Sequence, residues 1–217
     1  MDVDDDTGVL AIEILPLSMR ITPPILHRSS ICLAMTRILD THDINHFVLA
    51  AHSYGTVIVA HMLRSPELGH RITSALLIDP IPFLLHLPNV AYNFLYRQPR
   101  SANEWQLWYF ASRDADVSRS LSRHFFWTEC VLWKEDLDGR PIGVALSGDD
   151  QIVDAEAVRK YLTGEEEMKE SWENGTLQVL FYPSLDHAMV FDTKSRRFPL
   201  VNILRKFVQV DDNTRHV

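Results

Sequence analysis

An apolar run that ends in a serine and a glycine most constrains the fold of this chain. Residues 47–52 read Phe-Val-Leu-Ala-Ala-His, which is typical of a buried strand, and a helix-compatible apolar stretch begins after Gly55. A sharp turn from a strand into a helix holds a serine hydroxyl exposed at the end of a sheet. Ala51 and Gly55 flank Ser53 two positions away on either side, where we expect the close approach of strand and helix to require small side chains. The sequence therefore predicts a nucleophile elbow centred on Ser53.

Serine at this position also has a simpler explanation, because serine often caps the first turn of a helix. Two later segments favour the chemical explanation. Residues 144–150 form a strand-like run that ends in Asp149 and Asp150, and residues 177–183 form another that lies shortly before His187. Serine, acid and histidine in this order, each after a strand, are the parts of a Ser-His-Asp triad.

With these residues identified, the chain resembles the α/β-hydrolase superfamily, and it looks most like fungal serine hydrolases that carry a long helical cap. The resemblance extends over nearly all of the chain from Val9 onward. It implies an α/β fold with a mostly parallel, doubly wound sheet, reduced at its amino-terminal side. It also implies an acid in a Gly-x-Asp or Gly-x-x-Asp turn, which Gly148, Asp149 and Asp150 match. Asp150 is therefore the expected acid, and Asp149 is an alternative.

Asp79 is a further alternative acid, because some members of the fold place the acid after the preceding strand. Here that strand corresponds to residues 72–78, which Asp79 follows directly. A structural role is an equal alternative, in which the Asp79 side chain closes the strand through hydrogen bonds to the turn before Ile81.

The expected roles follow from the chemistry of each residue type. Serine is a weak nucleophile at neutral pH, so His187 would take the proton of Ser53 and return it to the leaving group. Asp150 would orient the imidazole and stabilise the imidazolium. The backbone N–H of Tyr54 is the expected oxyanion donor. We expect His52 to pack under the elbow, since adjacent residues of the turn point in different directions.

Composition excludes several other classes of protein. A chain of 217 residues, 46% of them hydrophobic, can build the core of one enzyme-sized domain. A net charge of -8 without a basic stretch disfavours nucleic-acid binding. Cys32 and Cys130 form no metal or redox motif, and the scarcity of cysteine favours a reducing compartment. The first residues are acidic, whereas a secretory signal begins with basic and then apolar residues, so we expect the cytoplasm. His42 and His46 lack a third ligand, so we expect no metal and no cofactor.

Strand-like and helix-like segments alternate along the chain, which predicts a parallel sheet covered by helices. The alternation stops after Asp79, and residues 80–139 hold four of the five tryptophans. The resemblance implies that this segment is a cap, or lid, between two core segments, 1–79 and 140–217. Its aromatic side chains either line an apolar substrate pocket or pack within the cap. The expected strands are 9–15, 47–52, 72–78, 144–150 and 177–183, and the expected helices are 25–40, 57–64, 155–162 and 198–208.

The amino-terminal part departs most from the resemblance. Hydrolases of this fold place several strands before the elbow, and a loop among them donates the second oxyanion N–H. Here one expected strand, 9–15, precedes the elbow strand, and no His-Gly motif is found. Either this strand moves beside the elbow strand and brings Pro16 and Leu17 toward the oxyanion site, or the chain is shortened and the sheet is left open.

Two functions follow from these observations. The first is a serine hydrolase that acts through an acyl-enzyme on an ester, thioester or lactone of an apolar small molecule. The second is a catalytically impaired, hydrolase-like protein that binds a small ligand or a partner. A strand 9–15 beside the elbow strand favours the first, and an open sheet edge favours the second. An epoxide hydrolase is disfavoured, because that reaction wants an aspartate in place of Ser53. Membrane docking is disfavoured too, since residues 81–96 contain prolines and little basic charge.

Overall fold

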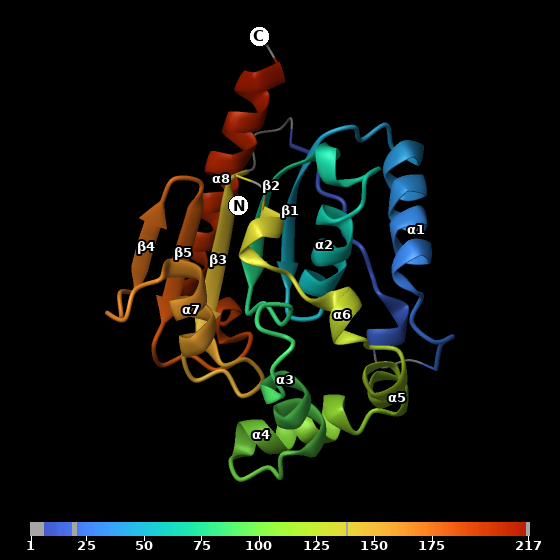
Figure 1. Ribbon diagram of the computed structural model, residues 1–217, viewed down its shortest axis with the longest axis vertical. Helices are drawn as coiled ribbons and strands as arrows, with labels where there is room; N and C mark the ends of the chain where they lie inside the picture. The colour runs from blue at the N-terminus through green and yellow to red at the C-terminus, as the bar shows by residue number, and fades with distance from the viewer. Residues whose placement is uncertain (1–6, 19–20, 138, 216–217) are drawn as a thin grey trace. The chain divides into compact units, whose positions relative to one another are not determined.

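The computed structural model describes residues 7–18, 21–137 and 139–215 and contains a five-stranded sheet (Figure 1). The order of the strands in the sheet is β1-β2-β3-β5-β4, and β1, β2, β3 and β5 run parallel while β4 is antiparallel to β5. The predicted α/β fold with a mostly parallel sheet is therefore confirmed. The strands are β1 (Phe47–His52), β2 (Ile72–Ile78), β3 (Ile142–Ser147), β4 (Ser171–Asn174) and β5 (Leu177–Tyr182).

Helices account for most of the other regular structure. The α-helices are α1 (Arg28–Thr41), α2 (Gly55–Leu63), α3 (Asn89–Ala91), α4 (Ala102–Leu107), α5 (Ala115–Arg123), α6 (Trp127–Cys130), α7 (Ala155–Thr163) and α8 (Lys194–Arg215). The 3-10 helices are η1 (Leu15–Leu17), η2 (Gly69–Arg71), η5 (Lys134–Leu137) and η6 (Met189–Phe191), and the π-helices are η3 (Tyr92–Tyr96) and η4 (Trp108–Ser112).

One predicted strand is wrong and one observed strand was not predicted. Residues 7–14 form no regular element, and the 3-10 helix Leu15–Leu17 follows them. An apolar run becomes a strand only where a neighbouring strand pairs with it, and sequence periodicity does not reveal the neighbour. Ser171–Asn174 was missed because three of its four residues are exposed and its sequence is mainly polar.

The central strands and the edge strand β1 differ in their surroundings. β2 is buried at all but one position and β3 at every position, as expected of parallel strands covered on both faces. β1 is only partly buried, and among the described residues it pairs with β2 alone. No strand in the described part of the chain lies on its other side. The sheet therefore has the open edge that the sequence offered as one of two outcomes.

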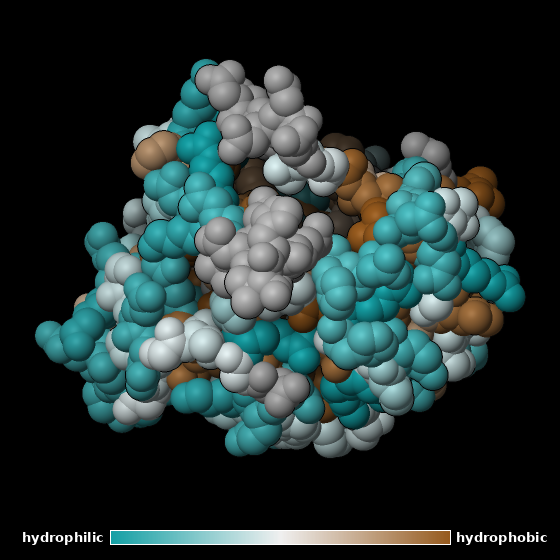
Figure 2. Space-filling view, turned by 90° about the horizontal axis from the view of Figure 1, so that it is seen from above, coloured by the Kyte–Doolittle hydropathy of each residue, from teal (hydrophilic) through white to brown (hydrophobic). Residues whose placement is uncertain are grey.

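The long helix α8 passes behind the strands in Figure 1 and contacts β1 and β2. The described residues on the face viewed in Figure 2 are mostly hydrophilic. Among the described residues, no helix combines the length and the apolar character needed to cross a bilayer. Buried residues shared by β2, β3, β5, α8 and the loop after β5 form an apolar core of Leu76, Ile78, Ala145, Leu180, Leu185, Val190, Leu200 and Ile203.

The chain divides into two compact units. One consists of the described part of Met1–Ile25 together with Pro99–His124, and it contains η1, α4, η4 and α5. The other consists of Leu26–Gln98 and the described residues from Phe125 onward, and it contains the whole sheet. The segment predicted to form the cap, 80–139, is divided between the two units. Its function as a lid stays a prediction.

Gly148 and Gly55 differ in the space available for a side chain, so alanine should have opposite effects at the two positions. A Cβ on Gly148 would lie 2.6 Å from the Pro183 carbonyl oxygen, whereas a Cβ on Gly55 would meet only the Ala51 Cβ at 3.5 Å. We expect Gly148→Ala to lower the free energy of unfolding by about 1–3 kcal/mol. Gly55→Ala, in the first turn of α2, should leave it unchanged or raise it by up to about 1 kcal/mol. Urea unfolding of both variants measures the difference, and equal losses would contradict it.

Candidate active site

Ser53 lies in the turn between β1 and α2. Its φ of 51° is in the left-handed region, which costs a non-glycine residue roughly 1–2 kcal/mol and is frequent at functional sites. The Ser53 N–H donates to the Ile78 carbonyl at 3.0 Å and so ties the turn to the end of β2. The steric restriction at Gly55 is milder than predicted, because an added Cβ would make an ordinary contact of 3.5 Å with Ala51.

Three predicted residues meet at the carboxyl ends of the parallel strands. Ser53 follows β1, Asp150 follows β3 and His187 follows β5. His187 Nε2 lies 2.9 Å from Ser53 Oγ, and His187 Nδ1 lies 2.7 Å from Asp150 Oδ2. The side chains of His187 and Asp150 are 9% and 1% exposed. With the ring proton on Nδ1, His187 donates to the carboxylate and accepts from the serine hydroxyl, as a Ser-His-Asp triad requires.

The turn that follows Asp150 orients its carboxylate. Asp150 Oδ1 accepts hydrogen bonds from the N–H groups of Ile152 at 2.7 Å and Val153 at 3.0 Å. Its Oδ2 is thereby left to accept from His187. The backbone of the turn thus sets the direction in which the acid points.

Asp149, the alternative acid next to it in sequence, is exposed. Its backbone N–H donates to the Leu185 carbonyl at 2.9 Å, and its carboxylate takes part in no hydrogen bond among the described residues. The structure brings Asp150 to His187 and does not bring Asp149 there.

Asp79, the other alternative acid, is buried but does not reach a ring nitrogen of His187. Its side chain is 1% exposed. Asp79 Oδ1 accepts from the Ser147 N–H at 3.0 Å, and Oδ2 accepts from the Ala188 N–H at 2.9 Å. Asp79 therefore connects the ends of β2 and β3 to the loop that carries His187.

The hydrogen bonds predicted between Asp79 and the turn before Ile81 are not formed. The Ile81 N–H instead donates to Thr56 Oγ1 at 3.3 Å, and the Thr56 hydroxyl donates to the Ser53 carbonyl. The prediction assumed a local turn, whereas the Asp79 carboxylate pairs with backbone groups more than 60 residues away in sequence.

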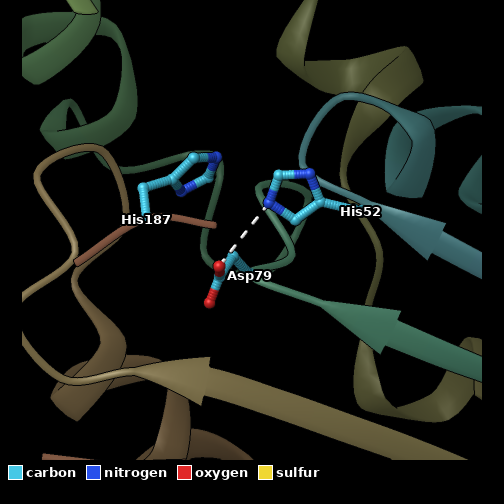
Figure 3. A group of neighbouring side chains, drawn as sticks. All are labelled: His52, Asp79 and His187. Atoms are coloured by element: carbon cyan, nitrogen blue, oxygen red, sulfur yellow. Dashed lines mark ion pairs between the residues drawn. The ribbon is translucent and has the colours of Figure 1, made fainter. Parts of the chain in front are cut away.

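His52, Asp79 and His187 lie together beneath the elbow (Figure 3). His52 Nε2 is 3.6 Å from Asp79 Oδ2, which is too long for a hydrogen bond, and no other described group pairs with this buried nitrogen. The His52 ring lies 4.9 Å from the His187 ring and 5.1 Å from the Phe191 ring, between centroids. His52 thus packs at the elbow as expected, and its contact with His187 was not foreseen.

The same three side chains could in principle hold a metal ion, since one ligand atom of each lies within 4.8 Å of the others. Both ring nitrogens of His187, however, are hydrogen-bonded to Asp150 and Ser53. A metal could bind His187 only if one of these hydrogen bonds broke. The donor set therefore fits a triad better than a metal site.

Three carboxylates act on the pKa of His187. Burial by itself would lower this pKa, but the hydrogen bond and charge of Asp150, together with the charges of Asp79 and Asp186, raise it above its ordinary value. Burial would likewise raise the pKa of Asp79, yet the contacts with His52 and His187 and two backbone N–H groups hold it below its usual range.

Asp186 belongs to the site and was not identified from the sequence. Its Oδ1 accepts from the His187 N–H at 2.7 Å and from the Gln151 N–H at 3.1 Å, and its Oδ2 accepts from Gln151 Nε2 at 3.1 Å. Asp186 therefore joins the loop of the acid to the loop of the histidine. Its position directly before His187 was the available signal, because aspartate often bonds nearby backbone N–H groups.

The Tyr54 N–H is the predicted oxyanion donor, and its surroundings are compatible with that role. It donates no hydrogen bond to any described residue. Tyr54 is the N-cap of α2, so the positive end of the helix dipole lies there. The Tyr54 ring lies 5.9 Å from the Phe125 ring, and desolvation raises the pKa of its hydroxyl.

The predicted source of a second oxyanion donor does not supply one. Pro16 has no N–H, and the Leu17 N–H already donates to the Ile14 carbonyl at 2.9 Å inside η1. The segment that was expected to form a strand therefore offers no unpaired donor at either residue.

The sequence matches no protein-family model and no curated protein. Solved structures do resemble it. A meta-cleavage product hydrolase from Pseudomonas fluorescens has a TM-score of 0.53 and 14% identity, over 88% of this chain and 75% of that one. A serine hydrolase from Cycloclasticus zankles has a TM-score of 0.50 and 16% identity, over 87% of this chain and 74% of that one. An α/β hydrolase from the sediment metagenome of the Mar Chica lagoon has a TM-score of 0.51 and 11% identity, over 87% of this chain and 73% of that one.

These similarities cover most of the chain at low sequence identity, so what they establish is the fold. The chain has the α/β-hydrolase fold, as the resemblance of its motifs implied. Because one fold hosts many reactions, the chemistry must be argued from the site itself.

Replacement of the two neighbouring aspartates distinguishes the acid. Asp150→Asn would present an amide to His187 and favour the wrong tautomer, so we expect the reaction of Ser53 with a fluorophosphonate to slow by about 10⁴-fold. Asp149→Asn removes an equal charge from an exposed side chain and should change this rate less than about twofold. Intact-mass spectrometry at timed intervals gives both rates. Equal effects would rule out the assignment of Asp150.

The raised pKa of His187 predicts the pH dependence of the same reaction. In a Ser-His-Asp triad the neutral histidine activates the serine, so we expect the labelling rate of Ser53 to fall as the pH decreases, with a midpoint above about 6.5, the ordinary histidine value. Asp79→Asn removes a negative charge that favours the imidazolium and should move the midpoint down. Because folding raises the pKa of His187, protonation of His187 stabilises the folded native protein at low pH. This contribution is lost as the pH rises through the pKa of His187. A midpoint at or below 6.5 in the native protein would contradict the argument.

Proposed function

We propose that this protein is a serine hydrolase that forms an acyl-enzyme on Ser53. The observation that carries the proposal is the hydrogen-bonded chain from Asp150 through His187 to Ser53, with distances of 2.7 and 2.9 Å. Ser53 is held in a strained turn at the end of a strand, where its hydroxyl can meet a carbonyl group. The hydrolases among the structures of the same fold support this class of reaction.

The reaction follows from the geometry. His187 Nε2 accepts the Ser53 proton as Oγ attacks the carbonyl carbon, and the resulting imidazolium is stabilised by Asp150. When the tetrahedral intermediate collapses, the bond to the leaving group breaks and His187 gives the proton to that group. A water then repeats the sequence on the acyl-enzyme, which releases the acid and restores Ser53.

The Tyr54 N–H would donate to the oxyanion in both steps. It is oriented by the first turn of α2 and has no other acceptor among the described residues. Loss of one of two oxyanion donors typically lowers turnover by about 10²–10³-fold. If Tyr54 acts without a second donor, turnover is correspondingly slow.

The proposed substrate is an ester, thioester or lactone of an apolar small molecule. Aromatic side chains support this choice. The Phe125 ring lies 5.9 Å from the Tyr54 ring at the elbow, and within residues 80–139 Trp127 and Trp133 lie 6.4 and 5.2 Å from the His86 ring. Sites for small molecules are mostly lined by apolar and aromatic groups. The similarity to fungal hydrolases with a cap, and the function of residues 80–139 as a lid, are parts of the same proposal.

The proposed compartment is the cytoplasm. Cys32 and Cys130 are both buried free thiols, as is usual for proteins of reducing compartments. We propose no nucleic-acid partner, because the negative net charge disfavours binding to phosphates.

A second function, a hydrolase-like protein that binds a small ligand or a partner, is favoured by one specific observation. β1 lies at an open edge among the described residues, and the expected strand 9–15 is not formed. In other proteins of this fold, a loop from strands that precede the elbow strand completes the oxyanion site. A triad of correct geometry with a single oxyanion donor could thus bind carbonyl compounds without rapid turnover.

Treatment with a fluorophosphonate distinguishes the two functions. The native protein and Ser53→Ala are each incubated with the reagent, and intact-mass spectrometry counts the adducts. We expect one adduct on the native protein and none on Ser53→Ala, because only an activated serine attacks phosphorus readily. Hydrolysis of short and long acyl p-nitrophenyl esters then measures turnover and the preference for apolar acyl groups.

Circular dichroism spectra of both proteins provide the control for folding. No adduct on a folded native protein would overturn the hydrolase and leave the binding function. An adduct without measurable ester turnover would indicate an activated serine with an incomplete oxyanion site.

A further inference from the structure

Three side chains that follow β2 contact the loop of the proposed acid. Asn89 Nδ2 donates to Asp154 Oδ2 at 3.1 Å, Asn93 Nδ2 donates to the Ile152 carbonyl at 3.1 Å, and Arg97 Nη2 donates to the Gln151 carbonyl at 2.7 Å. Asn89 begins α3, Asn93 lies four residues later in η3, and Arg97 directly follows η3. A spacing of four places side chains on one face of a helix. Asn93 and Arg97 thus donate to backbone carbonyls of the acid loop, whereas Asn89 donates to the exposed side chain of Asp154, the N-cap of α7.

The helix ends in a way that directs Arg97 at the loop. The Arg97 N–H donates to the Tyr92 carbonyl at 2.8 Å, which closes the π-helical turn, and the chain then becomes extended at φ -63° and ψ 131°. Single π-helical turns occur frequently at functional sites. Asn93 lies within this turn, so the two donors leave the same short, hydrogen-bonded segment.

The backbone N–H groups of the acid loop are held by two carboxylates, those of Asp150 and Asp186. The N–H groups of Ile152 and Val153 donate to Asp150, and the N–H of Gln151 donates to Asp186. These bonds orient the carboxylate toward His187. They constrain the N–H side of the loop only.

The carbonyl side of the loop depends on the helix. Arg97 and Asn93 pair with the carbonyls of Gln151 and Ile152, while the Val153 carbonyl accepts from the Ala155 N–H at 3.0 Å. Without these two donors, the carbonyls of Gln151 and Ile152 would be free to rotate toward water. Rotation of a peptide group moves its N–H as well, and the Ile152 N–H is one of the two that hold the Asp150 carboxylate.

We propose that Asn93 and Arg97 are positioning residues that fix the peptide groups of the acid loop and thereby hold Asp150 in line with His187. They act through the backbone and do not touch the reacting atoms. The proposal rests on the function proposed above for Ser53, Asp150 and His187. According to this proposal, the segment formed by α3, η3 and Arg97 helps to align the triad, whether or not it also contacts the substrate.

Two asparagines of the same helical face give a matched test. Asn93→Ala removes a donor to the loop backbone, and we expect it to slow fluorophosphonate labelling of Ser53 by about tenfold or more, since small misplacements can cost about 100-fold. Asn89→Ala removes a donor to an exposed side chain and should change the rate less than about twofold. Arg97→Met should slow labelling like Asn93→Ala, and Arg97→Lys, which keeps a charged donor, should recover part of the rate.

A second measurement separates alignment from a loss of stability. The ring signals of His187 are followed by NMR from pH 4 to 9 in the native protein, Asn93→Ala and Asn89→Ala. The bond to Asp150 helps to raise the pKa of His187, so Asn93→Ala, which changes no charge, should lower its midpoint while Asn89→Ala leaves it unchanged. A purely structural role would lower the free energy of unfolding without moving this midpoint.

The outcomes are separable from the test of the proposed function. If native Ser53 does not react, the hydrolase proposal fails, yet the NMR midpoint still tests the positioning of Asp150. If Asn93→Ala folds, labels at the native rate and keeps the native midpoint, the positioning proposal is overturned even though the hydrolase stands.

Discussion

The buried carboxylate of Asp79 is the constraint on which the arrangement of the site depends. It follows β2, in the middle of the parallel strands, and accepts one N–H from the end of β3 and one from the residue after His187. A buried N–H left without an acceptor costs about 1–3 kcal/mol, so the strand ends and the histidine loop are joined by more than packing. The same charge favours the protonated form of His187, which the proposed reaction forms transiently. One side chain thus contributes to both the shape and the electrostatics of the site.

The sequence predicted the residues that follow the strands better than the arrangement around them. Ser53, Asp150 and His187 could be found because each ends an apolar run, and β1 and β2 were predicted with the observed bounds. Asp79 and Asp186 could not be assigned their contacts, because their partners lie on other loops and a hydrogen bond across loops leaves no local pattern. Asn93 and Arg97 have a helical spacing, but nothing in the sequence indicates which surface that face meets. The false strand 9–15 has the same cause, since pairing depends on a neighbour.

The site contains the hydrogen-bonded chain from Asp150 through His187 to Ser53, and its proposed oxyanion environment has one identified donor, the Tyr54 N–H. The first depends on side chains after β1, β3 and β5, all within one compact unit. The second normally depends on strands on the far side of β1, where the described residues form none. Proton transfer and oxyanion stabilisation contribute separately to catalysis. The two functions proposed above differ in this respect, because the first needs both contributions and the second needs only a site that binds a carbonyl compound.

The position of β1 at the edge of the sheet has a consequence for the motions of the site. An edge strand is held by a ladder on one side only, so it opens by local unfolding at a lower free energy than a strand with two neighbours. Asp150 and His187 follow β3 and β5, which are paired on both sides, whereas Ser53 follows β1. Local opening of β1 would separate the serine hydroxyl from the imidazole and leave the acid and the histidine in contact. Among the described residues, the proposed nucleophile thus follows the one of the three strands that is paired on a single side, and we expect its alignment to be lost first when the site opens locally.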